Sequence, residues 1–351
     1  MARRARIAGL VTGFVLLLAG CGGGGGSASG GPTDLTAALG TVKDSVYSRA
    51  YFEWSDLAAV RKLAGLPPSA RHYSEHAIFS RWIDVFGVGT DGLAALEPRI
   101  TDTTSIDFLA AESAIGIGQP PDHAMRIDGS GVDAAAVTHS LLALGAKRES
   151  SGGRTFLALG GQNTVNLNSP LVSLGAVNQL DRVVASGHTV VGGSANGPVD
   201  SLLGGGRSLS ADSAYTAAAS CLGSVIVAVI APPAKLNAAT PAELLAFGVL
   251  KPSSSTAPVR EVLCAVDTSA GVAEQQAARM KTVLGPASQV RALPQSRVQS
   301  VTVKQIKTGS IDLMQGTVTL KPNAPVGFFY QAMSQGTIGL ILGALIHPQA
   351  T

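Results

Sequence analysis

The chain has 351 residues, of which 46% are hydrophobic and only 14% are charged, and its mean hydropathy is +0.29. Extended disorder is excluded, because a disordered chain has too few apolar residues to bury a core. A multi-span membrane protein is excluded as well, because uncharged apolar stretches near twenty residues occur at most twice. Beyond the first thirty residues the length suits one large domain or two lobes.

The N-terminus combines a basic and an apolar segment. Arg3, Arg4 and Arg6 precede the apolar residues 7–18, which are too few for a comfortable membrane span. They lead directly into Leu18-Ala19-Gly20-Cys21, and residues 22–31 are rich in glycine and small side chains. Such a composition is typical of a flexible tether.

The tetrapeptide ending at Cys21 resembles the lipobox of bacterial exported lipoproteins. The resemblance implies that residues 1–20 are a signal peptide cleaved before Cys21, whose thiol carries diacylglycerol, and that residues 21–33 are the tether. It places the protein on the outer face of the cytoplasmic membrane, held there by its lipid anchor. The alternatives are a secretory signal with a coincidental cysteine, or an uncleaved anchor. A twin-arginine route from Arg3-Arg4 fits poorly with the residues that follow.

Charge and residue usage narrow the class of protein further. Without Arg3, Arg4 and Arg6, the remaining 23 Lys and Arg balance 23 Asp and Glu, so the mature chain is formally neutral. A neutral chain without a basic run lacks the electrostatic signature of a nucleic-acid binder. The Ala- and Gly-rich composition, with 17 Arg against 9 Lys, resembles that of actinobacterial proteins.

The first part of the body shows helical spacing, then a change to strands. Leu35, Leu39, Val42 and Val46 predict a helix, residues 47–54 a strand, and residues 55–65 a short capped helix. A second helix is predicted over 74–86, followed by a loop over 97–105. Residues 114–118 and 123–128 then predict a hairpin.

The predicted order continues with a helix after Asp133, strands over 154–159, 180–185 and 188–191, a helix after Asp212, and a strand over 224–231 buried on both faces. After a linker near 251–257, a strand over 260–267 precedes a helix capped by Ser269. A hairpin over 298–307 and 310–321 and a helix from Pro325 complete the pattern.

Strand, helix, strand, strand, helix therefore occurs twice. The pattern predicts an α+β fold of mainly antiparallel sheets with helices on one face. We expect a first lobe over 34–235 and a second over 236–351, or one continuous domain. Residues 326–346 carry no charge; they predict a buried helix ending at Gly336 and then a core strand, with a second membrane anchor as the alternative.

Two cysteines remain once Cys21 is assigned to the lipid. Cys221 ends a predicted helix and Cys264 lies in the strand over 260–267. If the strands over 224–231 and 260–267 are neighbours, a disulfide is geometrically reasonable in an exported protein. The alternative is two buried free thiols, and two such cysteines do not make a metal site.

Two motifs match known catalytic or cofactor-binding patterns. His72-Tyr73-Ser74-Glu75-His76 has the spacing of inverted zinc peptidases, although Ser74 predicts that the helix begins after His72. Gly87-Val88-Gly89-Thr90-Asp91-Gly92 matches a dinucleotide-binding pattern, but it follows a helix rather than a strand and favours a helix end and turn.

Other catalytic signatures are missing from the sequence. Neither Ser-x-x-Lys nor Gly-x-Ser-x-Gly occurs, and Gly204-Gly205-Gly206 lacks the Lys of a phosphate loop. His123, His139 and His188 are isolated, and Asp102 and Asp107 cannot be assigned as acid and base from sequence. We therefore predict no catalytic residue, cofactor or metal.

The predicted function is a lipid-anchored, non-enzymatic binding or interaction module. Its partner is an envelope protein or, given the high apolar content, a lipid or another apolar small molecule. The alternatives are a transporter's solute-binding protein, which predicts two β/α lobes and a hinge, and an envelope hydrolase.

Overall fold

The structure is a computed structural model. It describes residues 34–67, 81–97, 99–254, 256–267, 269–285, 293 and 295–342. The predicted signal peptide, Cys21, the tether up to residue 33 and the His72–His76 motif lie outside the described residues.

The helices are α1 (Leu35–Thr41), α2 (Val46–Ala50), α3 (Leu57–Leu63), α4 (Ile83–Phe86), α5 (Arg99–Thr104), α6 (Ala134–Ala143), α7 (Asn196–Leu202), α8 (Ser213–Leu222), α9 (Ala270–Leu284), α10 (Phe328–Ser334) and α11 (Ile338–Leu342). The strands are β1 (Phe52–Asp56), β2 (Ser113–Gln119), β3 (Asp122–Asp128), β4 (Lys147–Ser151), β5 (Arg154–Ala158), β6 (Arg182–Ser186), β7 (Thr189–Gly193), β8 (Val225–Ala231), β9 (Leu244–Leu250), β10 (Arg260–Asp267), β11 (Val298–Thr308) and β12 (Ile311–Leu320).

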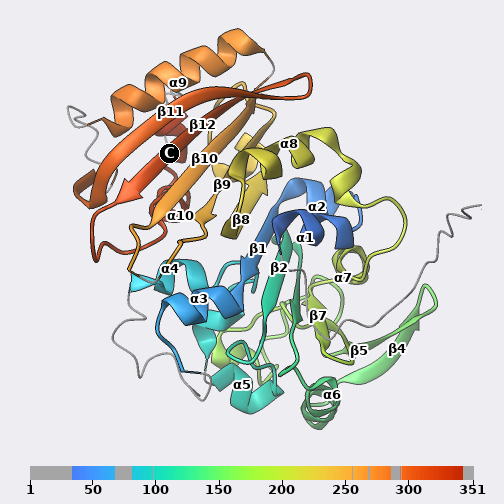
Figure 1. Cartoon of the computed structure of the whole chain (residues 1–351). Coiled ribbons are helices and arrows are strands. Elements are labelled where there is room, and N and C mark those ends of the chain that lie inside the picture. The colour runs from blue at the N-terminus through green and yellow to red at the C-terminus, as the bar shows by residue number, and fades with distance from the viewer. Residues whose placement is uncertain are drawn as a thin grey trace, which may run out of the picture.

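The described strands form one antiparallel sheet in the order β11-β12-β10-β9-β8-β1-β2-β3-β7-β6-β5-β4 (Figure 1). β1 lies in the middle, between β8 and β2, although it comes first in the chain. The predicted boundary between lobes, at residues 235 and 236, separates β8 from β9, which are hydrogen-bonded neighbours. The sheet is therefore continuous across that boundary.

Helices cover both faces of this sheet. One hydrophobic cluster contains residues of α3, α4, α5, α6, α9, α10 and α11, and the other contains residues of α1, α7 and α8. In β10, Leu263 and Ala265 belong to the first cluster and Val262, Cys264 and Val266 to the second. The α+β class with an antiparallel sheet is confirmed, and the placement of helices on one face is corrected. The correction has a physical reason, since strands buried on both sides need a helical layer on each.

The predicted repeat is clearest near the C-terminus. β10, α9, β11, β12 and α10 follow one another in the expected order. In the other half, β3 and α6 are followed by β4, whose five exposed residues carry no apolar alternation and gave no strand signal. Between the halves, β9 was also not predicted. Asp133, Asp212 and Ser269 cap α6, α8 and α9 as expected, each accepting a backbone N–H bond.

The uncharged C-terminal segment forms two short helices in its described part. α10 ends at Ser334, Gly336 follows with a φ of 65°, and α11 begins at Ile338 where a core strand was expected. Both helices are packed in the first cluster. Among the described helices, none has the length and apolarity needed to cross a bilayer.

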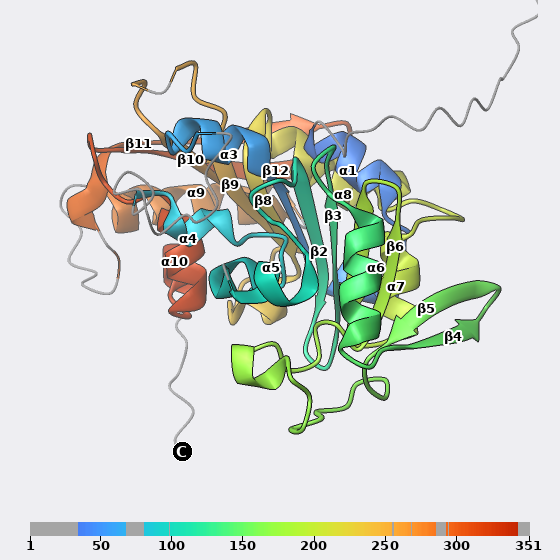
Figure 2. The ribbon, with the colours of Figure 1, turned by 90° about the horizontal axis from the view of Figure 1, so that it is seen from below.

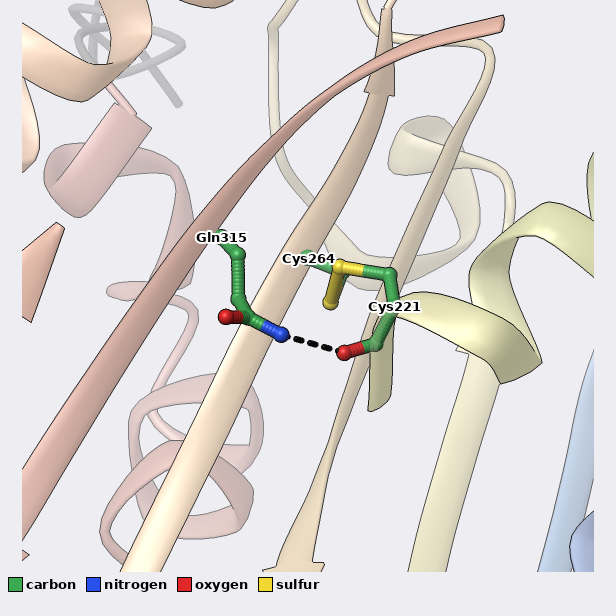
Figure 3. Close-up of a disulfide and its surroundings, with 3 residues drawn as sticks. All are labelled: Cys221, Cys264 and Gln315. Carbon is green, nitrogen blue, oxygen red and sulfur yellow. Dashed lines mark hydrogen bonds between the residues drawn. A yellow bond between two sulfur atoms is a disulfide. The ribbon is translucent and has the colours of Figure 1, made fainter. Parts of the chain in front are cut away.

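A disulfide joins Cys221 at the end of α8 to Cys264 in β10, with the Cα atoms 6.2 Å apart (Figure 3). The strands on which the expectation depended are not neighbours, because β9 lies between β8 and β10. The bridge instead links a helix to the strand beneath it. On β12, opposite Cys264, Gln315 donates a 2.5 Å hydrogen bond to the Cys221 carbonyl and so satisfies an acceptor at the helix end.

We expect this disulfide to stabilise the fold strongly, because it closes a loop with a sequence separation of 43. The loop-entropy relation gives about 4 kcal/mol for a loop of this length. The Cys221→Ser/Cys264→Ser chain should lose about 2–4 kcal/mol of unfolding free energy, measured by urea denaturation. Treatment with a reductant should reproduce the loss in the wild type and leave the double variant unchanged. Equal stability of the two proteins would contradict this role.

Candidate functional site

A buried histidine whose ring is bonded to two other side chains lies near the turn between β2 and β3. His123, on β3, donates from Nδ1 to Asp91 Oδ2, and its Nε2 lies 3.2 Å from Asn178 Oδ1. Asp91 comes from the turn after α4, and Asn178 from the long segment between β5 and β6. The site thus joins three regions distant in sequence.

The segment over 159–181 lies across this histidine. Asn163 bonds Asp122 through its side chain at 2.8 Å and the Ser194 carbonyl through its backbone at 2.7 Å. Figure 2 shows the segment, in light green, running below the β2–β3 hairpin. As a result His123 is only 3% exposed.

Two carboxyl groups near the site differ in their surroundings, because Asp91 is bonded to His123 whereas Asp181 is buried. Burial alone would lower the pKa of His123, but the hydrogen bond and charge of Asp91 outweigh burial, so the pKa is raised. Both ring nitrogens then donate, as an imidazolium requires. Asp181 is 6% exposed, and burial raises its pKa to about 6, against the lowering effects of the Thr164 amide, Arg182 and His123.

Glu53 forms a second buried polar contact nearby. Its carboxylate accepts a 2.5 Å hydrogen bond from the Tyr51 hydroxyl and a 2.8 Å hydrogen bond from the Gly89 amide. Burial raises the pKa of Glu53. Gly89 has a φ of 82°, and a Cβ there would lie 2.9 Å from the Ala114 carbonyl oxygen. The Gly87–Gly92 motif is therefore a turn packed on β2, as favoured from its position after a helix, and the Gly89 amide is already bonded to a carboxylate.

The remaining sequence candidates are dispersed. His139 is exposed on α6, and His188 contacts the Val132 carbonyl at 3.1 Å. Asp107 accepts bonds from the Leu109 and Ala110 amides within a turn, whereas Asp102 is exposed on α5. The structure does not assemble these groups into a site with His123.

The chemistry available at His123 is limited by its partners. The imidazole Nε2 faces the Asn178 amide oxygen, and no hydroxyl or thiol of the described residues is bonded to it for activation as a nucleophile. Within the described ranges, no three His, Cys, Asp or Glu side chains are grouped as a metal site would require. The arrangement can hold charge and fix the 159–181 segment to the sheet, which is a structural role.

The sequence alone did not identify Asp91, Asn178 and Asp181 as residues around His123. It also did not identify Glu53 as a buried hydrogen-bond acceptor. Asp91 was noted only as part of the glycine motif, and no spacing links it to His123, 32 positions away. Glu53 offered one usable signal, since a carboxylate inside an aromatic, β-like run predicts a buried and partnered charge.

Comparison of the chain with protein-family models, curated proteins and solved structures finds no match.

The pKa shifts predict how stability changes with pH. The raised pKa of His123 contributes stability that is complete below about pH 6.5 and is lost as pH rises through its folded pKa. Asp181 changes the stability with pH in the same direction. Burial disfavours its ionised form in the folded protein, so its contribution to stability is lost as pH rises through its folded pKa of about 6.

Asp181→Asn should therefore raise the unfolding free energy at pH 7.5 by roughly 1–3 kcal/mol and have little effect at pH 4. His123→Gln should remove part of the stability present at pH 5.5. Urea unfolding at these pH values measures both effects, with Asp102→Asn as the exposed control. A destabilised Asp181→Asn protein at pH 7.5 would refute this assignment.

Proposed function

We propose that this protein is a lipoprotein of the cell envelope, anchored through Cys21 to the outer face of the cytoplasmic membrane, which acts there as a non-enzymatic interaction module. The observation that carries the anchor is the order of the N-terminal sequence: basic residues, an apolar stretch, Leu18-Ala19-Gly20-Cys21 and a glycine-rich linker. The first described helix begins soon afterwards, at Leu35.

The disulfide supports an exported location. Cys221 and Cys264 are joined and are at most 2% exposed. Disulfides persist in oxidising compartments and are rare in the cytosol. This support is independent of the N-terminal motif, because it rests on residues 200 or more positions further along the chain.

The positions of buried polar groups and exposed apolar groups favour an interaction role over catalysis. The two ring nitrogens of His123 are bonded to Asp91 and Asn178 within the protein. By contrast, residues 159–180 carry no charge, and Val165, Leu167 and Val177 are 57%, 75% and 39% exposed. Long loops that expose apolar side chains are commonly used for binding.

The anchor is tested by comparing the wild type with Cys21→Ser. Wild type should fractionate with membranes, and its intact mass should equal that of the chain from Cys21 onward plus the lipid. Cys21→Ser should retain the signal segment and carry no glyceride. Cys221→Ser serves as the control, since it removes a different cysteine and should keep the lipid. An unlipidated wild type would end the proposal.

The interaction surface is tested by Leu167→Asp, with Val46→Asp as the matched control because Val46 is 76% exposed on α2. Chemical crosslinking in intact cells should give a discrete adduct that Leu167→Asp loses and Val46→Asp keeps. Both variants should unfold like wild type. A stoichiometric lipid found by mass spectrometry of the detergent-extracted protein, with no adduct, would favour the carrier role instead.

A further inference from the structure

The two edges of the sheet differ sharply in how they are protected from pairing with another strand. β4 is short, all five of its residues are exposed, and Lys147, Arg148 and Glu149 give it charges of both signs. Short, charged edges resist association. β4 with β5 also projects away from the body (Figure 1).

The opposite edge, β11, lacks these protections along much of its length. It has 11 residues, contains no proline, glycine or acidic residue, and its first six residues, 298–303, are uncharged. Its one partner among the described strands is β12. Roughly half of its backbone N–H and C=O groups therefore face outward, which is the geometry used when an extended peptide adds to a sheet.

A depression of about 320 Å³ adjoins this edge. It is lined by Lys281, Leu284 and Gly285 at the end of α9 and by Val298–Val301 of β11. A strand added beside β11 would place its side chains next to this depression, between helix and sheet. The apolar parts of Leu284 and Val298 and the ammonium of Lys281 offer contacts for alternate side chains.

The charges along β11 indicate what kind of strand would pair with it. Lys304 and Lys307 are exposed, and Lys281 adds a third cation beside the strand. Lys307 lies 3.5 Å from Asp312, whereas Lys281 and Lys304 have no ion pair within the described part of the chain. Two copies paired along β11 would bring only cations to the shared seam, which is unfavourable. An acidic strand would neutralise them.

We propose that β11 is a docking edge that binds an extended, acidic peptide segment of a partner protein by adding it to the sheet. Backbone hydrogen bonds supply the register, and Lys281, Lys304 and Lys307 supply the preference for Glu or Asp. The inference rests on the proposed role as an interaction module, but it does not require lipidation at Cys21.

Lys304 and Lys307 are three positions apart and so lie on opposite faces of β11. The probe is therefore a fluorescent peptide of about ten residues, blocked at both ends, with Glu residues on both of its faces and Val and Thr between them. Binding to the full chain in detergent is measured by anisotropy. Lys304→Glu/Lys307→Glu should weaken binding about tenfold or more, and Lys147→Glu/Arg148→Glu at the other edge should leave it unchanged. Hydrogen exchange in residues 298–308 should slow when the peptide binds.

A second peptide separates strand addition from simple charge attraction without altering the protein. N-methylation of every residue removes the donors along both edges of the peptide and should abolish binding at equal charge. Absence of binding by the first peptide, equal binding of the methylated one, or equal effects of the two charge reversals would each overturn the proposal. A Cys21→Ser chain, which carries no lipid anchor, should still bind the peptide. This result would distinguish failure of the docking proposal from failure of the anchor proposal.

Discussion

Two buried carboxylates hold the layer of helices that covers one face of the sheet. Glu53, on central strand β1, accepts from the Gly89 amide, and Glu261, on β10, accepts from the amides of Gly327, Phe328 and Phe329 at the start of α10 at 2.7–3.2 Å. A buried carboxylate is costly unless charge-assisted hydrogen bonds compensate it. The crossing segments are therefore fixed where these amides meet the carboxylates.

The same anchors bring the N-terminal and C-terminal parts of the chain together. Gly327 passes so close to α4 that a Cβ there would lie 3.0 Å from Asp84 Cβ. The Val326 amide donates to the Arg81 carbonyl, and Arg81 Nε donates to the Ala324 carbonyl. On the other face, the disulfide fixes α8 to β10. The two lobes expected from the repeat thus share one sheet and contribute helices to the same layer, and on the other face α8 of the first lobe is bonded to a strand of the second.

Local sequence patterns predicted the strands well where apolar and polar side chains alternate, and the helices well where a side chain caps the N-terminus. The hairpins β2–β3 and β11–β12 and the caps at Asp133 and Ser269 follow from nearby residues. The placement of β1 between β8 and β2 depends on pairing over more than 170 positions, which no local pattern encodes. The contact of Asp91 with His123 escaped prediction for the same reason, since it exists only after the segments are packed.

The division of polar groups between the interior and the surface bears on function. Glu53, Glu261 and His123 look reactive in isolation, yet each has its hydrogen-bonding capacity directed at this chain's own backbone or side chains. Groups already satisfied in this way would have to break native contacts to act on a substrate, at a cost of a few kcal/mol each. The backbone groups along the outer edge of β11 have no such internal partner among the described strands, and Val165, Leu167 and Val177 in the 159–180 segment are exposed. Recognition at the surface therefore requires less disruption of this fold than chemistry in its interior.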